Sequence, residues 1–247
     1  MKRIHILILL LVYFFYADPV LGQVTKAKAI YKVKLEVENS EKDKFSKRIK
    51  MVLEEIENIR VAFLYSNGKG SFKATEDIAL DYMTQLNRNS ARTFSGTRDN
   101  YYYNLEEKKI ASNREIEGTV YTIVYRLDTF DWQLHNETKT VHDYVCYKAT
   151  AVYSYKARKG PVTLDITAWY APQIPLPLGP KNYTGLPGLI LELQEGPRTM
   201  YITELSLNPK QKITIEKVPQ GEEVTEKEFE KIAAEAYGDL LEAIKNE

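Results

Sequence analysis

The sequence predicts an α+β fold that is mainly β: a long, curved antiparallel meander sheet with one helix after the first strand and one C-terminal helix. Three observations predict it. Apolar residues alternate with polar ones over 27–37 and over most of 58–218, they recur at helical spacing over 41–57, and a capped apolar stripe follows Thr225. A meander of this length rarely stays flat, so we compare it with the half-barrel of periplasmic lipoprotein carriers.

Residues 1–22 have the features of a secretory signal. Lys2 and Arg3 form a positive start, and Ile6–Ala17 is an apolar stretch that is short for a membrane span. Small residues precede Gln23, so we predict cleavage before it and export of the mature chain. The alternative is an uncleaved membrane anchor. After cleavage, we expect that the mature chain is not an integral membrane protein.

Composition limits the partners and the number of domains. Without Lys2, Arg3 and Asp18, residues 23–247 carry 32 basic and 33 acidic side chains. This balance argues against nucleic acid and anionic membrane surfaces as partners. Cys146 is the only cysteine, so no intramolecular disulfide can form, which suits a bacterial periplasm or cell surface. No repeat or linker divides residues 23–247, and we predict a single domain.

The first two elements follow from simple patterns. Alternation over 27–37 predicts a half-buried strand, and the apolar spacing over 41–57 predicts a helix with Ser40 as its cap. Residues 75–98 fit a short helix or a strand and loop equally well.

The middle of the chain predicts a series of strands. Asn67-Gly68 and Glu106-Glu107 mark hairpin turns between alternating segments. We expect strands at the following ranges: 61–65, 101–105, 108–113, 119–127, 131–136, 139–156, 162–170, 188–194, 199–207 and 211–218.

The C-terminus predicts a helix. Thr225 and Glu228 form a capping box, and an apolar stripe runs from Phe229 to Ile244. We expect this stripe to dock on a sheet face, although a free helix that recruits a partner is the alternative.

Residues 168–193 are apolar enough for a core, yet their prolines exclude a helix or a paired central strand across most of them. We predict an irregular loop over 171–187, with Pro187 and Gly188 in a type II turn and Gly188 at positive φ. Gly185, Pro187 and Gly188 would form the structural motif. Two interpretations remain open: a rigid corner in which Leu186 plugs the sheet, or an apolar lip that contacts a ligand or partner.

No constellation of catalytic or metal-binding residues emerges. In the predicted strand 139–156, His142 and Cys146 are about 13 Å apart, too far for proton transfer between them. The mature chain has two histidines and one cysteine without a recognised ligand spacing, so we expect neither a metal nor a cofactor. A pair of carboxylates for hydrolysis cannot be located by sequence.

One face of the predicted sheet has aromatic and polar residues. Val145, Tyr147 and Ala149 would face the core, and His142, Tyr144 and Cys146 the other side. With Trp169, Asp165 and the tyrosines at 101–103, this second face is either a binding cavity or a core covered by a helix. The candidate ligand- or partner-binding residues are Trp169, Tyr170, Ile174, Leu176, Leu186, Tyr144 and His142.

The segment Gly185-Leu186-Pro187-Gly188-Leu189-Ile190, with Ala168–Pro172 before it and Tyr144-x-Cys146-x-Lys148-Ala149 further upstream, resembles the GLPGLI family of secreted proteins from Gram-negative bacteria. The resemblance runs from about residue 100 to 218. It implies a signal peptide and a location in the periplasm, outside the cell or on the surface of a Gram-negative bacterium. The family has no established activity or catalytic residues, so the resemblance implies no site.

These observations predict an exported, non-enzymatic binding or assembly protein. The curved sheet and the 171–187 loop would contact an apolar small molecule, a lipid or an envelope protein. The alternative is an extracytoplasmic hydrolase, or an accessory domain of one, that uses carboxylates.

Overall fold

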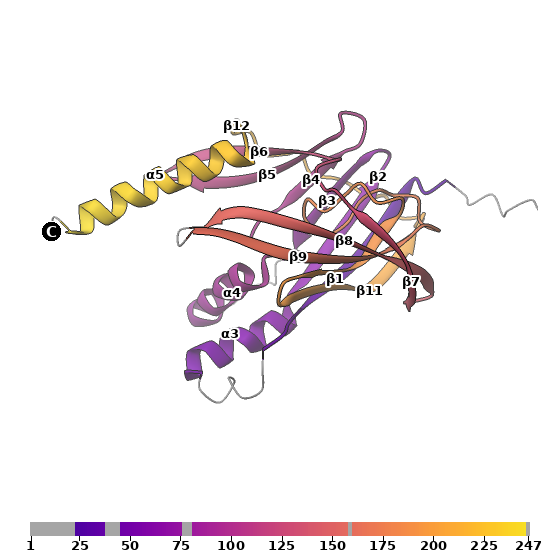
Figure 1. Cartoon of the computed structure of the whole chain (residues 1–247), viewed down its shortest axis with the longest axis horizontal. Helices are drawn as coiled ribbons and strands as arrows, with labels where there is room; N and C mark the ends of the chain where they lie inside the picture. Colours follow the sequence, from indigo (N-terminus) through magenta and orange to yellow (C-terminus); the bar gives the residue numbers. More distant parts are fainter. Residues whose placement is uncertain (1–22, 38–44, 76–80, 158–159, 246–247) are drawn as a thin grey trace, which may run out of the picture.

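The computed structural model describes residues 23–37, 45–75, 81–157 and 160–245, and the predicted signal lies outside them. These residues form twelve strands and three helices (Figure 1). The strands are β1 (Lys26–Leu35), β2 (Arg60–Ser66), β3 (Lys69–Ala74), β4 (Tyr101–Asn104), β5 (Lys109–Ile116), β6 (Thr119–Arg126), β7 (Gln133–Val141), β8 (Tyr144–Ala157), β9 (Gly160–Ala171), β10 (Leu189–Glu195), β11 (Arg198–Leu207) and β12 (Glu222–Thr225). The helices are α3 (Lys47–Asn58), α4 (Tyr82–Ser95) and α5 (Glu226–Lys245).

All twelve strands belong to one curved sheet, in the order β12-β6-β5-β4-β3-β2-β1-β11-β10-β9-β8-β7. Two antiparallel meanders, β1–β6 and β7–β11, meet where β1 pairs with β11. The predicted mainly β fold is therefore confirmed, and the sheet stays open with β12 and β7 at its ends.

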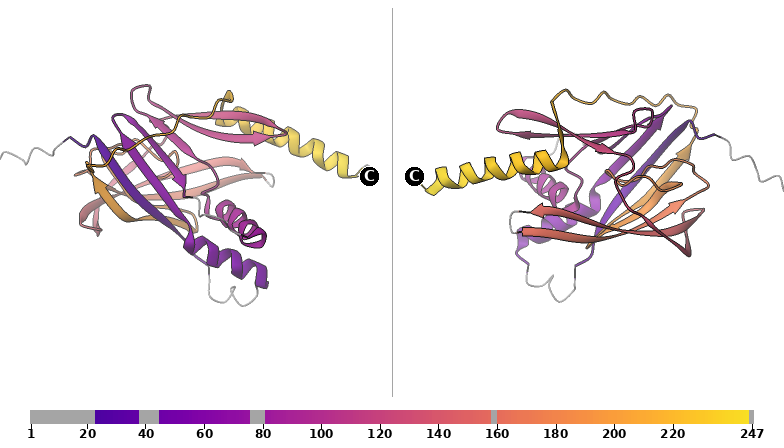
Figure 2. Two further views of the ribbon diagram at one scale, coloured as in Figure 1. Left: turned by 180° about the vertical axis from the view of Figure 1, so that it is seen from behind. Right: turned by 45° about the horizontal axis from the view of Figure 1, so that its top comes forward.

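The C-terminal part of the sheet differs from the prediction. Residues 211–218 form no strand but an irregular connection that crosses from β11 to the far end of the sheet (Figure 2). There β12 pairs in parallel with β6, so the sheet is mixed rather than purely antiparallel. Exposed lysine and proline residues in 209–219 explain why the apolar alternation did not produce a paired strand.

The predicted helix after the first strand is confirmed, but the predicted position of its N-terminus is wrong. Ser46, not Ser40, is the N-cap of α3, because its side chain accepts a hydrogen bond from the backbone N–H of Ile49. Ser40 and the rest of 38–44 lie outside the described residues. The unassigned region 75–98 contains α4, which Asp81 caps and Gly96 ends in the left-handed conformation.

The C-terminal helix begins with the predicted capping box. The carboxylate of Glu228 accepts the backbone N–H of Thr225 at 2.7 Å, and the Thr225 hydroxyl accepts the backbone N–H of Glu228 at 3.2 Å. Phe229 is buried and packs edge-on against Tyr121 of β6. Farther along, α5 extends past the sheet (Figure 1), and the side chains of the stripe from Tyr237 onward lie outside the described ones. No helix in the described ranges is long and apolar enough to cross a membrane.

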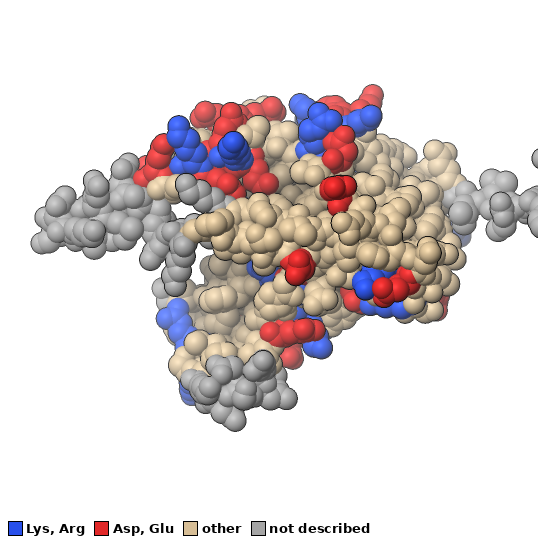
Figure 3. Space-filling model, viewed as in Figure 1, with Lys and Arg blue, Asp and Glu red and all other residues tan. Residues whose placement is uncertain are grey.

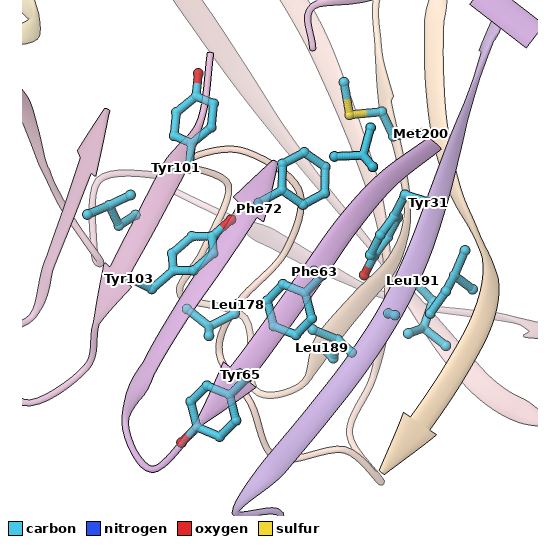
Figure 4. Close-up of a cluster of buried hydrophobic side chains, with 14 of the residues drawn as sticks. Tyr31, Phe63, Tyr65, Phe72, Tyr101, Tyr103, Leu178, Leu189, Leu191 and Met200 are labelled. Carbon is cyan, nitrogen blue, oxygen red and sulfur yellow. The ribbon is translucent and has the colours of Figure 1, made fainter. Parts of the chain in front are cut away.

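The concave side of the sheet is filled by the Pro-rich loop, residues 172–188, which connects β9 to β10. Ile174, Leu176 and Leu178 are almost fully buried in the main core against aromatic side chains of β1–β4 (Figure 4). Leu186 and Tyr183 are buried in a second cluster with residues of β8–β10. The loop is thus part of the interior, as its apolar composition requires.

Backbone hydrogen bonds fix the loop where prolines prevent regular pairing. The backbone N–H groups of Leu189 and Ile190 donate to the carbonyl groups of Ile174 and Leu178, both at 3.0 Å. A buried tyrosine of the sheet adds a side-chain donor: the Tyr103 hydroxyl lies within hydrogen-bond distance of the carbonyls of Gly179 and Lys181. An irregular buried segment needs such partners for its backbone.

The predicted turn at Pro187 and Gly188 has a different geometry. The Gly188 N–H donates to the Leu186 carbonyl at 2.8 Å, a three-residue turn around Pro187. Gly188 does not adopt positive φ, whereas Gly185 does, at +93°. Glycine is required at 188 because a Cβ atom there would lie 2.3 Å from the carbonyl oxygen of Ala171. Close approach of two backbones, rather than turn conformation, explains this glycine.

Candidate functional site

The predicted site residues divide between the interior and one end of the sheet. Ile174, Leu176 and Leu186 are buried in the Pro-rich loop, with exposed fractions of 0 to 2%. Trp169, Tyr170 and Tyr144 lie on β8 and β9, near the turn that joins β7 to β8. The structure therefore supports the plug interpretation of Leu186. In the second group, Tyr144 and Trp169 are half-buried, whereas Tyr170 is buried in the second cluster.

His142 does not share a strand face with Tyr144. The predicted single strand 139–156 is wrong, because β7 ends at Val141 and β8 begins at Tyr144. His142 lies in the turn between them with φ of +53° and is exposed. Sequence alternation continues through a two-residue turn, so it concealed this hairpin.

The tyrosines at 101–103 are not neighbours of Trp169 in the sheet. They lie on β4, and five strands separate β4 from β9. The predicted aromatic and polar face is therefore not assembled. Trp169 instead packs at the edge of the main core, where the Lys139 ammonium lies 4.4 Å from its ring centre and 2.7 Å from the Glu192 carboxylate.

An exposed apolar surface is present where the prediction placed core residues. Val145 and Tyr147 of β8 have exposed fractions of 43% and 39%, and Leu134 of β7 has 58%. The register places Thr138 and Thr140 beside them on the same face. We call these five residues the contact face. They carry no charge, and Tyr170 borders them with its ring 6.3 Å from that of Tyr147.

The surface around this region has no dominant charge. On the side seen in Figure 3, Lys and Arg are interspersed with Asp and Glu, and a band over β8 and β9 is largely uncharged. This distribution agrees with the near-neutral composition and provides no basic stripe of the kind that nucleic acid requires.

A second feature, which sequence analysis missed, is a group of charged and tyrosine side chains between the two meanders. At its middle, the Lys181 ammonium lies 2.7 Å from both carboxylate oxygens of Glu195. The Tyr183 hydroxyl donates to the same carboxylate at 2.7 Å, and the Arg198 guanidinium lies 3.3 Å from it. Glu195 is thus surrounded by three donor groups that join the Pro-rich loop to β10 and β11.

Two further pairs surround this group. Arg114 of β5 donates to Asp99 at 3.0 Å, and the Tyr153 hydroxyl of β8 donates to Glu226 of α5 at 2.7 Å. We call the whole set the polar centre. It consists of Asp99, Asn100, Tyr101, Ser112, Arg114, Tyr125, Tyr153, Lys181, Tyr183, Glu195, Arg198 and Glu226.

Burial and neighbouring charge shift the titration of these groups in opposite directions. Burial opposes ionisation of Glu195, but Lys181 and Arg198 outweigh it, so the pKa of Glu195 lies below its usual value. Burial lowers the pKa of Lys181, against the attraction of Glu195. Burial raises the pKa of Glu226 despite its hydrogen bond from Tyr153. Of these two glutamates, Glu226 therefore takes up a proton more readily than Glu195.

Neither the cysteine nor the possible metal ligands form a reactive site in the described ranges. Cys146 is fully buried, and burial raises the pKa of its thiol to about 11, which keeps it a neutral thiol. In the described ranges, no group of three or more histidine, cysteine, aspartate or glutamate residues is placed to hold a metal ion.

In a comparison with known protein families, part of the chain matches the model of a family whose function is unknown. A family model described as "Protein of unknown function (Porph_ging)" matches residues 156–192, which include the whole of β9 and the whole Pro-rich loop. This match is consistent with the GLPGLI resemblance. No curated protein matches the chain.

Solved structures share the fold. The chain is similar to PNGF-II in the P21 space group, with a TM-score of 0.51, 10% identity and coverage of 86% of this chain and 34% of that chain. The C2 form gives a TM-score of 0.49, 10% identity and coverage of 85% and 33%. The chain therefore spans about a third of the PNGF-II chain. At this identity the likeness concerns the fold alone.

Proposed function

We propose that this is an exported, non-enzymatic binding or assembly protein of the Gram-negative envelope, and that it binds another envelope protein through the contact face. Residues 1–22 support export. The observation that carries the binding proposal is the exposure of Leu134, Val145 and Tyr147 side by side at the end of an ordered sheet. Large apolar side chains grouped in this way are typical of interaction surfaces.

A protein partner fits this surface better than an apolar small molecule. The concave side, where a carrier would hold its ligand, is occupied by the Pro-rich loop. The contact face is instead at the end of the β7–β8 hairpin, where Leu134, Val145 and Tyr147 are exposed, and Tyr147 offers both an aromatic ring and a hydroxyl group. Tyrosine is enriched among the residues that anchor protein interfaces.

The β8 strand supplies a matched test of this proposal. The double variant Val145→Lys and Tyr147→Glu places charges on the contact face, whereas Val152→Lys places one on the opposite face at a residue with 64% exposure. We expect photo-crosslinking from residue 134, in the periplasm of the host, to give one defined adduct in the wild type and in Val152→Lys. The double variant should lose at least nine-tenths of it.

The mature chain recovered in the same experiment should begin at Gln23. Equal crosslinking by all three proteins, or a chain that keeps Met1 and stays in the cytoplasm, would contradict the proposal. Circular dichroism of each variant checks that the fold is retained.

The rival function, a hydrolase that uses carboxylates, rests on Glu226 and its raised pKa. The carboxylate whose charge acts on Glu226 is Glu230, one turn further along α5, whereas Asp99 and Glu195 of the polar centre are held in ion pairs. A carboxylate in an ion pair is poorly placed to act as a second acid or base, so Asp99 and Glu195 do not support hydrolysis.

A further inference from the structure

Two buried polar atoms of the polar centre have no hydrogen-bond partner within the described ranges: Asn100 Oδ1 and Ser112 Oγ. The hydroxyl groups of Tyr101 and Tyr125 also have no hydrogen bond to the described residues, although they are not among the fully buried atoms; the two residues have exposed fractions of 4% and 6%. Buried polar groups in folded proteins are nearly always paired, and leaving one unpaired costs about 1–3 kcal/mol. Several such groups in one place therefore indicate that something else binds them.

These groups lie close to one another on the inner side of the sheet. Ser112 of β5 is the register partner of Tyr101 of β4, so their side chains share a face. The rings of Tyr101 and Tyr125 are 6.2 Å apart. Figure 4 shows the Tyr101 hydroxyl pointing away from the apolar side chains around Phe72 and Tyr103. Asn100 precedes Tyr101 in the chain.

The charges of the polar centre indicate a neutral ligand. Asp99 is paired with Arg114, and Glu195 with Lys181 and Arg198. The unpaired groups are hydroxyls and an amide oxygen, which together offer both donors and acceptors. A ligand that satisfies them needs several groups that can both donate and accept, and hydroxyl groups do this.

Aromatic rings pack around Tyr183, another member of the polar centre. Phe130 stacks on Tyr183 with 4.6 Å between ring centres, and Trp132 and Tyr153 lie 5.5 and 6.0 Å from Phe130. Phe130, Trp132 and Tyr153 are only partly buried, so part of each ring remains free. Aromatic faces pack on C–H surfaces while nearby polar groups fix orientation.

From these observations we propose that the polar centre binds a neutral, polyhydroxylated ligand of the saccharide class. Hydroxyl groups of the sugar would pair with Tyr101, Ser112 and Tyr125, and its C–H face would lie against the rings at 130 and 132. This site is separate from the contact face, and either proposal can fail without the other.

Saturation-transfer NMR with maltose, cellobiose and lactose tests the proposal on the full mature protein. We expect transfer from the protein to at least one of these sugars. Ser112→Ala and Tyr101→Phe should each weaken binding by about threefold to tenfold, the effect of one hydrogen bond. Because these hydroxyls have no protein partner, neither variant should unfold at a lower temperature than the wild type. Tyr147→Phe, on the contact face, is the matched control and should bind as the wild type does.

Three results of the binding measurements would each overturn the proposal: no transfer to any of the three sugars, unchanged affinity in both hydroxyl variants, or binding of glucose 6-phosphate in place of the neutral sugars. Lower unfolding temperatures of Ser112→Ala and Tyr101→Phe would show that these hydroxyls have protein partners, and this too would contradict it.

Discussion

Gly188→Ala is expected to destabilise the protein by about 3 kcal/mol or more, the upper end of the cost of overpacking a core. The added methyl group would lie 2.3 Å from the Ala171 carbonyl oxygen and 2.8 Å from the Pro172 nitrogen, and both are backbone atoms. Neither can move without shifting the end of β9 or the start of the Pro-rich loop. Urea denaturation followed by circular dichroism measures the effect.

Gly118→Ala is the matched control for this variant. Gly118 has φ of +79°, yet a Cβ atom there would meet nothing within 4 Å. Its substitution should therefore cost only the strain of a left-handed alanine, about 1–2 kcal/mol. Equal loss in the two variants would mean that conformation, rather than close approach, explains the glycine at 188.

Glu195→Gln is expected to cost about 3–5 kcal/mol, the loss seen when one partner of a buried ion pair is removed. The glutamine can still accept the Tyr183 hydrogen bond, but the Lys181 ammonium, itself buried, would lose its counter-charge. Glu204→Gln breaks the Arg60–Glu204 pair on the surface, where the side chains are 44% and 59% exposed. That control should cost less than about 1 kcal/mol.

The same pair predicts a pH dependence. Because the pKa of Glu195 is lower in the folded protein, its ionisation contributes stability above the unfolded pKa of about 4.5. This contribution is lost as the pH falls through the folded pKa. The difference in unfolding free energy between the wild type and Glu195→Gln should therefore shrink below pH 4.5 and stay constant between pH 6 and 8. A difference that is independent of pH from 3 to 8 would contradict an ionised Glu195.

The strands and capped helices could be predicted because local patterns determine them. Alternation in β1 and β9, and the capping box of α5, each depend on residues within one element. The pairing of β1 with β11 could not be predicted, because it joins segments 160 or more residues apart whose alternation suits many partners. The hairpin at His142 was missed because a two-residue turn preserves the alternation.

The polar centre could not be predicted because its members come from elements spread over residues 99–226. No short motif joins Asp99 to Arg114 or Tyr153 to Glu226. One local signal existed: Lys181 and Asn182 are polar residues within an otherwise apolar, proline-rich stretch. In such a stretch a charged side chain must find a buried partner, and here that partner is Glu195.

Hydrogen exchange of residues 173–186 tests most directly the claim that the Pro-rich loop is part of the core. The Gly185 N–H donates to the Pro177 carbonyl at 3.1 Å, and Tyr183 is almost fully buried. We predict that these amides exchange as slowly as those of β9 and β10, because they open only when the sheet does. Exchange within seconds, as expected for the exposed connection at 209–221, would show that the loop is free and would contradict this account of the fold.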